Sequence, residues 1–294
     1  MARTQNLTGM ALMIAAMACF AIGDSLIKWV SADLPVGQIL ALLGAGGGTL
    51  FALMARARGV APLAPDFLRR AVILRNACEI VGTLCFITAL SLIDISMAAA
   101  ILQATPLAVT LGAALLLQEP VGWRRYSALA VGFVGVLIML RPGMGGFDPL
   151  ALWAIAGMLA LSMRDLSTRM IPATVPTLRV STYGMSMLLP AGLALLAING
   201  GAQPMQGWHW AYMAGAVIVG ATGYHAITSA MRMGDISVVS PFRYARMVFA
   251  LIIGIAFFGE RPDLATLIGV SLTIAAGLYT FMRERQKRPA LAPR

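Results

Sequence analysis

Three long stretches of this sequence contain no Asp, Glu, Lys or Arg: residues 34–55, 95–118 and 180–231. A helix needs roughly 20 apolar residues to cross a hydrocarbon layer about 30 Å thick. The first two stretches fit one crossing each, and the third fits two, which the turn-forming run 199–204 separates. Because a buried helix of a soluble protein keeps a charged face, the pattern predicts an all-α protein that crosses a membrane several times.

Apolar runs separated by charged or turn-rich breaks predict ten transmembrane helices. Their expected ranges are 7–30, 36–55, 70–91, 95–118, 124–141, 148–169, 179–199, 208–231, 237–259 and 262–282. The first run follows Arg3 and loosely resembles a secretory signal. We expect it to be retained as the first helix, because it has a counterpart in the second half of the chain.

The second half of the chain repeats the first at a shift of 141 residues, without a gap. The shift aligns Asp94–Ser96 with Asp235–Ser237, Glu119 with Glu260, Pro35 with Pro176, Gly82 with Gly223, Ala89 with Ala230, and Asp24 with Asp165. A unit of five helices is odd in number, so the second copy enters the membrane from the opposite side, as in many secondary transporters. We therefore expect a first five-helix repeat at 1–145, an inverted second repeat at 146–283 and a basic cytoplasmic tail at 284–294.

The formal net charge of +10 follows the predicted topology and gives no reason to expect a nucleic-acid partner. Cytoplasmic loops of membrane proteins collect Lys and Arg. With the N-terminus inside, the outer segments hold only Lys28, Arg141 and Arg261. The inner segments hold Arg3, Arg56, Arg58, Arg69, Arg70, Arg124, Arg125, Arg164, Arg169, Arg179, Arg232, Arg283, Arg285, Lys287, Arg288 and Arg294. This asymmetry predicts a bacterial inner-membrane protein with both termini in the cytoplasm.

Each predicted repeat carries a helix, a Glu, a short loop and a further helix. The first copy runs from 89–96 through Gln118-Glu119-Pro120 to Arg141-Pro142-Gly143, and the second from Asp235-Ile236-Ser237 to Gly259-Glu260. Over essentially the whole chain this pattern resembles the drug/metabolite transporter superfamily, EamA type. The resemblance implies a carrier or exporter of amino acids or related metabolites that works by alternating access. It also implies a central cavity lined mainly by predicted helices one, three, four, six, eight and nine, while other relatives move nucleotide sugars, phosphorylated sugars or vitamins.

The third predicted helix carries Arg75, Asn76 and Glu79. Ionisable groups at membrane depth are costly and are candidates for function. Arg75 and Glu79 are four residues apart and so share a helix face. Two interpretations stay open: mutual neutralisation, or a Glu79 that faces the cavity as a proton acceptor or as a partner for a substrate ammonium.

The ninth predicted helix carries Arg243, Tyr244 and Arg246, with no acid on that helix before Glu260. Two arginines three residues apart share a face, and a guanidinium fork suits a carboxylate or a phosphate. This pattern favours a substrate with an anionic group, and the alternative is that the arginines snorkel toward the membrane surface.

The fourth predicted helix contains Gln103 and, three residues later, Pro106, which removes a backbone hydrogen bond. Gln103 aligns with Tyr244 under the repeat shift, so the two residues are predicted to flank one site. The alternative for Pro106 is a packed kink that lines no cavity.

Two acid-first pairs at i, i+4 spacing, Asp24 with Lys28 and Asp165 with Arg169, are aligned by the repeat. Such pairs attract each other on a helix surface. We interpret them either as gating contacts at opposite ends of the bundle or as plain interfacial ion pairs.

The eighth predicted helix carries Tyr224 and His225, which are candidates for substrate binding and a proton relay, although a buried hydrogen-bonded histidine is the simpler interpretation. His209 lies between Trp208 and Trp210, as in an interfacial aromatic belt. The glycines of 44–48 form a GxxxG pattern, which predicts close helix packing.

Two other classes of function were weighed against a small-molecule transporter. An intramembrane enzyme needs a recognisable catalytic set, which two histidines and no central acid pair do not supply. Polar residues on predicted helices three, four, eight and nine argue against a purely structural subunit. The three cysteines form no CxxC, so neither a metal nor a cofactor is predicted. The expected partners are a small-molecule substrate and the lipid bilayer, while the substrate's identity, transport direction, proton coupling and a homodimer stay open.

Overall fold

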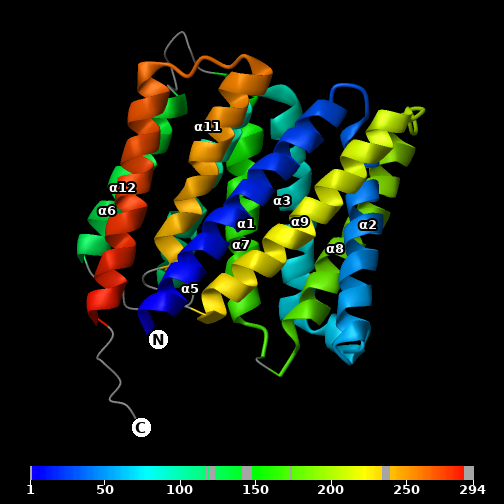
Figure 1. Cartoon of the computed structure of the whole chain (residues 1–294), viewed down its shortest axis with the longest axis horizontal. Helices are drawn as coiled ribbons and strands as arrows, with labels where there is room; N and C mark the ends of the chain where they lie inside the picture. Colours follow the sequence, from blue (N-terminus) through cyan, green and yellow to red (C-terminus); the bar gives the residue numbers. More distant parts are fainter. Residues whose placement is uncertain are drawn as a thin grey trace.

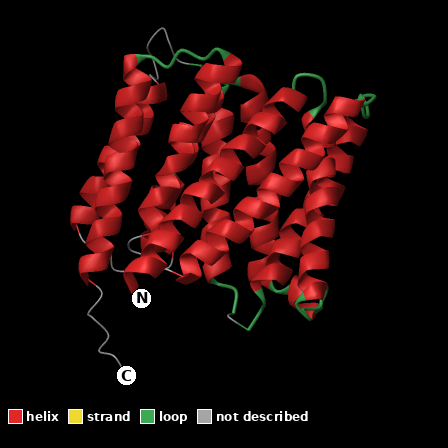
Figure 2. Cartoon of the chain, viewed as in Figure 1, coloured by secondary structure: helices red, strands yellow, loops and turns green. Residues whose placement is uncertain are grey.

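The computed structural model describes residues 2–116, 118, 123–140, 148–172, 174–233 and 239–287, and within these ranges every regular element is a helix (Figure 2). The α-helices are α1 (Ala2–Val30), α2 (Val36–Ala57), α3 (Arg70–Leu92), α4 (Ile95–Leu102), α5 (Thr105–Leu116), α6 (Trp123–Leu140), α7 (Ala151–Arg169), α8 (Thr177–Ile198), α9 (Gly207–Met233), α11 (Ala245–Phe258) and α12 (Leu264–Lys287). Two 3-10 helices, η1 (Pro65–Leu68) and η2 (Ser240–Tyr244), complete the set.

These helices confirm the predicted spans, with boundaries shifted by a few residues. Five of the described helical stretches are long and apolar enough to cross a membrane: Gln5–Val30, Val36–Ala57, Arg70–Leu92, Ile95–Leu116 and Thr177–Ile198. Large apolar side chains also face outward, as lipid requires. Leu53, Ile218 and Ile252 are each more than half exposed. The chain is a multi-pass membrane protein.

The fourth predicted span is one crossing made of two helices, α4 and α5, with a break at Gln103 and Ala104. Pro106 has no N–H to give to the carbonyl of Leu102, which is its helical partner. The Thr105 hydroxyl donates to that carbonyl instead, at 2.6 Å. The predicted break at Pro106 is thus confirmed, and a neighbouring side chain satisfies the freed backbone group.

The ninth predicted span is also interrupted, because it begins as η2 and becomes α-helical only from Ala245. Under the repeat shift, this junction aligns with the α4–α5 break. At its other end α11 finishes at Gly259, which has a φ of 65°. Glycine reaches this left-handed conformation without strain, and the turn lets the Glu260 N–H donate to the Gly254 carbonyl at 3.0 Å.

Helices of the first half of the chain pack on helices of the second half. The main partnerships are α1 with α9, α2 with α8, α3 with α7, and α6 with α12. Figure 1 shows α2 and α8 at one edge of the bundle and α6 and α12 at the other. Single contacts recur at the same shift: Gly82 packs on Leu161, and Gly223 packs on Phe20. Equivalent helices of the two halves therefore pack on each other with pseudo-twofold symmetry. The start of α1 and the end of α12 lie at the same end of the bundle (Figure 1).

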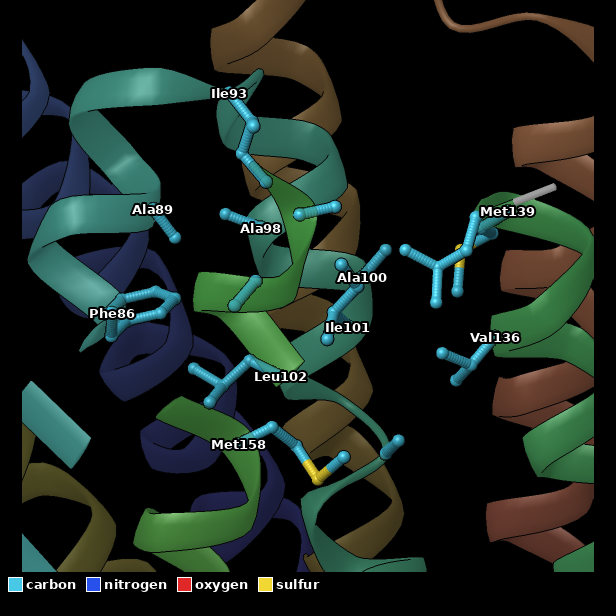
Figure 3. Close-up of a cluster of buried hydrophobic side chains, with 14 of the residues drawn as sticks. Phe86, Ala89, Ile93, Ala98, Ala100, Ile101, Leu102, Val136, Met139 and Met158 are labelled. Atoms are coloured by element: carbon cyan, nitrogen blue, oxygen red, sulfur yellow. The ribbon is translucent and has the colours of Figure 1, made fainter. Parts of the chain in front are cut away.

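The largest buried cluster ties the broken span to its neighbours. Ala98 and Ile101 of α4 pack with Phe86 of α3, Val136 of α6 and Met158 of α7 (Figure 3). Because α4 is short, this burial from several sides holds it in place.

The crossing of α2 and α8 is close because glycines lie on it, as the GxxxG pattern predicted. A Cβ atom on Gly44 would collide with the backbone at Leu188 and Leu189. Gly192 lies similarly close to the backbone at Ala41. Contact of this kind gives van der Waals packing where lipid supplies no hydrophobic drive.

Gly44→Ala is expected to lower the unfolding temperature of the detergent-purified protein, because overpacking a close contact costs about 1–3 kcal/mol. Gly220→Ala is the matched control, since a Cβ there meets nothing within 4 Å. Equal behaviour of the two variants would contradict a tight α2–α8 crossing.

Candidate functional site

Glu79 on α3 is the centre of a buried ionic network. Its Oε2 atom lies 2.7 Å from a terminal nitrogen of Arg75, and its Oε1 atom lies 3.1 Å from a terminal nitrogen of Arg164 on α7. Thr83 also donates to Oε1 at 3.4 Å. Each carboxylate oxygen of Glu79 is therefore occupied by a guanidinium, so the side chain links α3 to α7.

The interpretation of Arg75 and Glu79 as mutually neutralising is confirmed, with Arg164 as a third member. Arg164 was counted in the sequence only as a basic residue of an inner segment. Its Nε and one terminal nitrogen both donate to Oδ1 of Asp165, at 2.9 and 2.7 Å. The missed signal is that an arginine inside the predicted sixth helix needs an acidic partner at membrane depth.

A second buried ion pair joins the two halves of the chain. Arg246 on α11 donates to Oδ2 of Asp24 on α1, at 2.7 and 3.2 Å. The Arg246 guanidinium also lies over the rings of Phe20 and Phe86, 5.4 and 5.8 Å from their centroids. Arg246 is therefore neutralised inside the bundle and does not snorkel to the surface.

The predicted pairing of Asp24 with Lys28 is corrected, because each side chain has another partner. The Lys28 ammonium donates to the carbonyls of Leu90, at 3.1 Å, and of Ile93. These carbonyls close the C-terminal turn of α3, where a cation is favoured by the helix dipole.

Glu260 caps the start of α4, directly after the end of α3 that Lys28 binds. Its carboxylate accepts the backbone N–H groups of Ile95 and Ser96 and the Ser96 hydroxyl. The first N–H groups of a helix have no intrahelical partner, so this carboxylate supplies one. The sequence counterparts Glu119 and Asp235–Ser237 lie outside the described residues, as do Pro120 and Arg141-Pro142-Gly143.

Arg243 on η2 differs from the other arginines of the cluster. Among the described residues no carboxylate lies within 4.0 Å of its guanidinium, and its side chain is exposed. Gln103, at the α4–α5 break, donates to the Arg243 carbonyl at 3.2 Å.

The described charged residues around Glu79 and Asp24 carry one more positive than negative charge. Three carboxylates face four guanidiniums: Asp24, Glu79 and Asp165 against Arg75, Arg164, Arg243 and Arg246. These residues and Gln103 come from α1, α3, the α4–α5 break, α7, η2 and α11. The sequence paired Asp24 and Asp165 with Lys28 and Arg169, and in the structure they bind Arg246 and Arg164 instead; a surplus of positive charge in a substrate cavity stays a prediction.

The predicted pairing of Asp165 with Arg169 is corrected as well, because Asp165 accepts from the adjacent Arg164. The second oxygen of Asp165 accepts from no residue in the described ranges, and the side chain is 37% exposed. Arg169 lies at the end of α7, outside this contact.

Tyr244 and Tyr224 both lie in the bundle but face different helices. The Tyr244 hydroxyl lies against Gly277 of α12. The Tyr224 hydroxyl is hydrogen-bonded to Ser181 on α8 at 2.6 Å, and its ring packs edge-on against Phe51 at 5.0 Å.

His225 is exposed and shares a stripe of α9 with Ile218 and Thr222, which are also exposed. Residues three, four and seven apart lie on one helix face, so His225 faces away from the packed side of α9. The prediction of His225 as a buried site residue is therefore corrected. The other histidine, His209, is buried against Asp33 at 3.0 Å, although its neighbours Trp208 and Trp210 are exposed as an aromatic belt requires.

Asn76 is 5% exposed and lies beside Arg75 on α3. Its Oδ1 atom accepts from a terminal nitrogen of Arg75 at 3.2 Å, which leaves its amide group as a donor. Neither that amide nitrogen nor Nε of Arg75 has a hydrogen-bond partner in the described part of the chain. Buried donors are nearly always satisfied, so this pair can serve an acceptor that binds there. The same ranges contain no group of three His, Cys, Asp or Glu side chains that could hold a metal ion.

Comparison with known proteins gives a family match in both halves of the chain. The profile of the EamA-like transporter family matches residues 7–141 and again residues 149–282. A solved crystal structure of another protein superposes with a TM-score of 0.64 at 20% identity, over 95% of this chain and 99% of that one. At that identity the structural likeness shows the fold.

Several relatives are named as transporters. A riboflavin transporter of Rhizobium johnstonii is 29% identical over 71% of this chain and 70% of its own length. An S-adenosylmethionine uptake transporter of Rickettsia bellii is 26% identical over 73% of both chains. A pseudopaline exporter of Pseudomonas aeruginosa is 25% identical over 92% of this chain and 94% of its own.

The Asp24–Arg246 pair can be tested by a double-mutant cycle. Asp24→Asn or Arg246→Met alone leaves one uncompensated buried charge, which costs about 3–5 kcal/mol of stability. The double variant is expected to lose much less than the sum of the two single losses. Equilibrium unfolding in detergent measures all four proteins, and strictly additive losses would show that the two side chains do not interact.

Proposed function

Because this chain belongs to the EamA-like transporter family, we propose that it carries an amino acid or a related carboxylate-bearing zwitterion across the bacterial inner membrane by alternating access. The family and the named relatives are transporters of small molecules and not enzymes. The choice of substrate and direction is our proposal.

Arg243 is the observation that supports an anionic group on the substrate. The Arg243 guanidinium has no ion-pair partner among the described residues. The backbone carbonyl of Arg243 accepts a hydrogen bond from Gln103 at the helix break. The Arg243 side chain is exposed, so a substrate carboxylate can reach it and supply the partner through charge-assisted hydrogen bonds.

Asp165 supports an amino group on the same substrate. The sequence offered Glu79 for this role, but two guanidiniums occupy both of its oxygens. Asp165 has one carboxylate oxygen that no described residue uses, and its side chain is 37% exposed. We therefore assign the substrate ammonium to Asp165 and the substrate carboxylate to Arg243.

A second class of substrate is a phosphorylated sugar, a nucleotide or a vitamin. Arg243 suits a phosphate as well as a carboxylate, and one relative is named for riboflavin. The buried donors of Arg75 and Asn76 would serve a neutral acceptor such as a ring carbonyl. In this alternative Arg243 binds the substrate's anionic group and Asp165 does not contact the substrate.

For the direction we propose export, since a relative that aligns over 92% of this chain is named as an exporter. The start of α1 and the end of α12 lie at one end of the bundle (Figure 1). Arg56, Arg58, Arg69 and Arg70 lie in the segments that connect α2 to α3 at that end. The positive-inside rule supports placing this end in the cytoplasm. Three further properties also stay predictions: proton coupling, a homodimer, and gating by Asp24, Lys28, Asp165 and Arg169.

A thermal-shift screen of detergent-purified protein distinguishes the substrate classes. A ligand that binds only the folded state at 100 times its Kd adds about 2.7 kcal/mol of apparent stability. We expect stabilisation by amino acids, and flux of the stabilising compound into protein-only liposomes. Stabilisation by phosphorylated sugars, nucleotides or vitamins alone would move the proposal to the second class.

Arg243→Gln is expected to reduce liposome flux at least about tenfold, the effect of losing roughly 1.4 kcal/mol of binding, without lowering the unfolding temperature. Arg243→Lys keeps the charge but not the fork, so partial flux is expected. Arg58→Gln, an exposed arginine that follows α2, is the control. Full flux in Arg243→Gln would remove the proposed anion site, while the family assignment would stand.

Glu79→Gln should reduce both flux and stability, because two buried guanidiniums lose their carboxylate.

A further inference from the structure

The α2–α3 segment, which runs from the last turn of α2 to the start of α3 (residues 56–70), presents a basic surface at the end of the bundle where α1 starts (Figure 1). Its four arginines are all exposed: Arg56, Arg58, Arg69 and Arg70. The segment contains one acid, Asp66. The Asp66 carboxylate binds Arg69 at 3.0 Å and Arg179 of α8 at 2.7 Å. Five guanidiniums against one carboxylate leave four positive charges on this surface.

The α2–α3 segment is folded against the start of α8. The Tyr183 hydroxyl accepts the Ala64 N–H at 2.9 Å and donates to the Ala64 carbonyl at 3.0 Å. The Phe67 ring packs edge-on against the Tyr183 ring, with the ring centroids 5.2 Å apart. Nε of Arg179 donates to the Ala61 carbonyl at 2.8 Å. The segment therefore has a defined conformation, which fixes where its side chains point.

Two leucines of the same segment are largely uncovered. Leu63 is 76% exposed and Leu68 is 74% exposed, although both lie outside the apolar spans of α2 and α3. Leu68 directly precedes the arginine pair at residues 69 and 70. Amphipathic segments bind at the interface of a bilayer with this combination, because the basic side chains meet the headgroups and the leucines enter the acyl boundary.

The internal repeat shows that the fold does not need these arginines to connect the two helices. Residues 56–70 align with residues 197–211, which connect α8 to α9 and contain no Asp, Glu, Lys or Arg. The two connections are held in the same way. Gln38, which aligns with Arg179, exchanges hydrogen bonds with the backbone of Gln203 at 2.9 and 2.8 Å. The arginines therefore need an explanation other than the structure of the connection.

We propose that the α2–α3 segment is a binding surface for anionic phospholipids. Its charge complements a phosphate, whose oxygens accept paired, charge-assisted hydrogen bonds from guanidiniums. Basic clusters beside a transmembrane helix bind anionic headgroups, and Leu63 and Leu68 enter the acyl layer. The surface shares no residue with the candidate site, so the inference does not depend on the proposed substrate. Arg58→Gln alone keeps three of the four arginines and is still expected to transport normally.

Native mass spectrometry of the detergent-purified protein measures lipid binding directly. The protein is mixed with equal amounts of phosphatidylglycerol and phosphatidylcholine that carry the same acyl chains. The ratio of the two lipid-bound forms reports the preference for an anionic headgroup. Each arginine near an anionic surface contributes about fivefold, so the parent protein is expected to prefer phosphatidylglycerol at least about tenfold.

The preference should fall at least about tenfold in the variant that combines Arg56→Gln, Arg58→Gln, Arg69→Gln and Arg70→Gln. The matched control removes four positive charges from the C-terminal end of the chain: Arg283→Gln, Arg285→Gln, Lys287→Gln and Arg288→Gln. This control has the same net charge and should keep most of the preference.

Equal loss of preference in the two fourfold variants would overturn the inference, because binding would then follow net charge and not the α2–α3 segment. An unchanged preference in the first variant would also overturn it. Unfolding temperatures show whether each variant folds. If the first variant does not, the triple variant that retains Arg69, and with it the Arg69–Asp66 pair, takes its place.

Leu63→Ser combined with Leu68→Ser tests whether the ligand is a lipid and not free phosphate. Binding of phosphatidylglycerol should weaken several-fold, because the apolar contact with the acyl chains is lost. The control is Ile198→Ser combined with Leu264→Ser, two side chains of similar exposure, 79% and 76%, at the other end of the bundle. Equal binding in the two double variants, or displacement of the lipid by an equal concentration of inorganic phosphate, would overturn the assignment to lipid.

Discussion

The interior of a bilayer has no water to satisfy polar groups, so each backbone donor, acceptor and charge of this protein needs a partner within the chain. The broken fourth span shows the consequence most directly. Pro106 removes one hydrogen bond, and the hydroxyl of Thr105 replaces it at 2.6 Å. Lys28 binds the carbonyls that end α3, and Glu260 binds the N–H groups that begin α4. An irregular segment can therefore exist at membrane depth because side chains from other helices complete it.

The same requirement explains why the charged residues form connected groups. Glu79 is bound by Arg75 and Arg164, and Asp24 is bound by Arg246. The Glu79–Arg164 and Asp24–Arg246 contacts each also join a helix of one repeat to a helix of the other, whereas Arg75 and Glu79 both lie on α3. Neutralising charge and holding the halves together are thus achieved by the same side chains. Arg243 is the exception, and for this reason it is the residue on which the proposed function depends.

The inverted repeat sets the helix arrangement, while the charges break its symmetry. Gly82 on Leu161 and Gly223 on Phe20 are equivalent contacts in the two halves. Glu79 aligns with Gly220, and Arg164 aligns with Gly23, so the ionic network has no counterpart in the other half. A pseudosymmetric scaffold thereby presents a polar and asymmetric interior, in which the substrate site is assigned to a single set of residues.

The helices, the inverted repeat and the break at Pro106 could be read from the sequence, because hydropathy, turn residues and the 141-residue shift are local or periodic properties of the chain. The residues of the candidate site could also be nominated, since a charge within an apolar span is visible without a fold. The ion-pair partners of these charged residues could not be predicted from the sequence. The i, i+4 rule suggested Lys28 for Asp24 and Arg169 for Asp165, whereas the structure gives Arg246 and Arg164. Similarly, His225 was nominated for the interior but lies on the outward face of α9. The sequence determined which segments cross the membrane and which charges must be neutralised there. Only the packing of α1 on α11 and of α3 on α7 decided which charges meet, because ion pairs between helices depend on distances that no spacing within one helix contains.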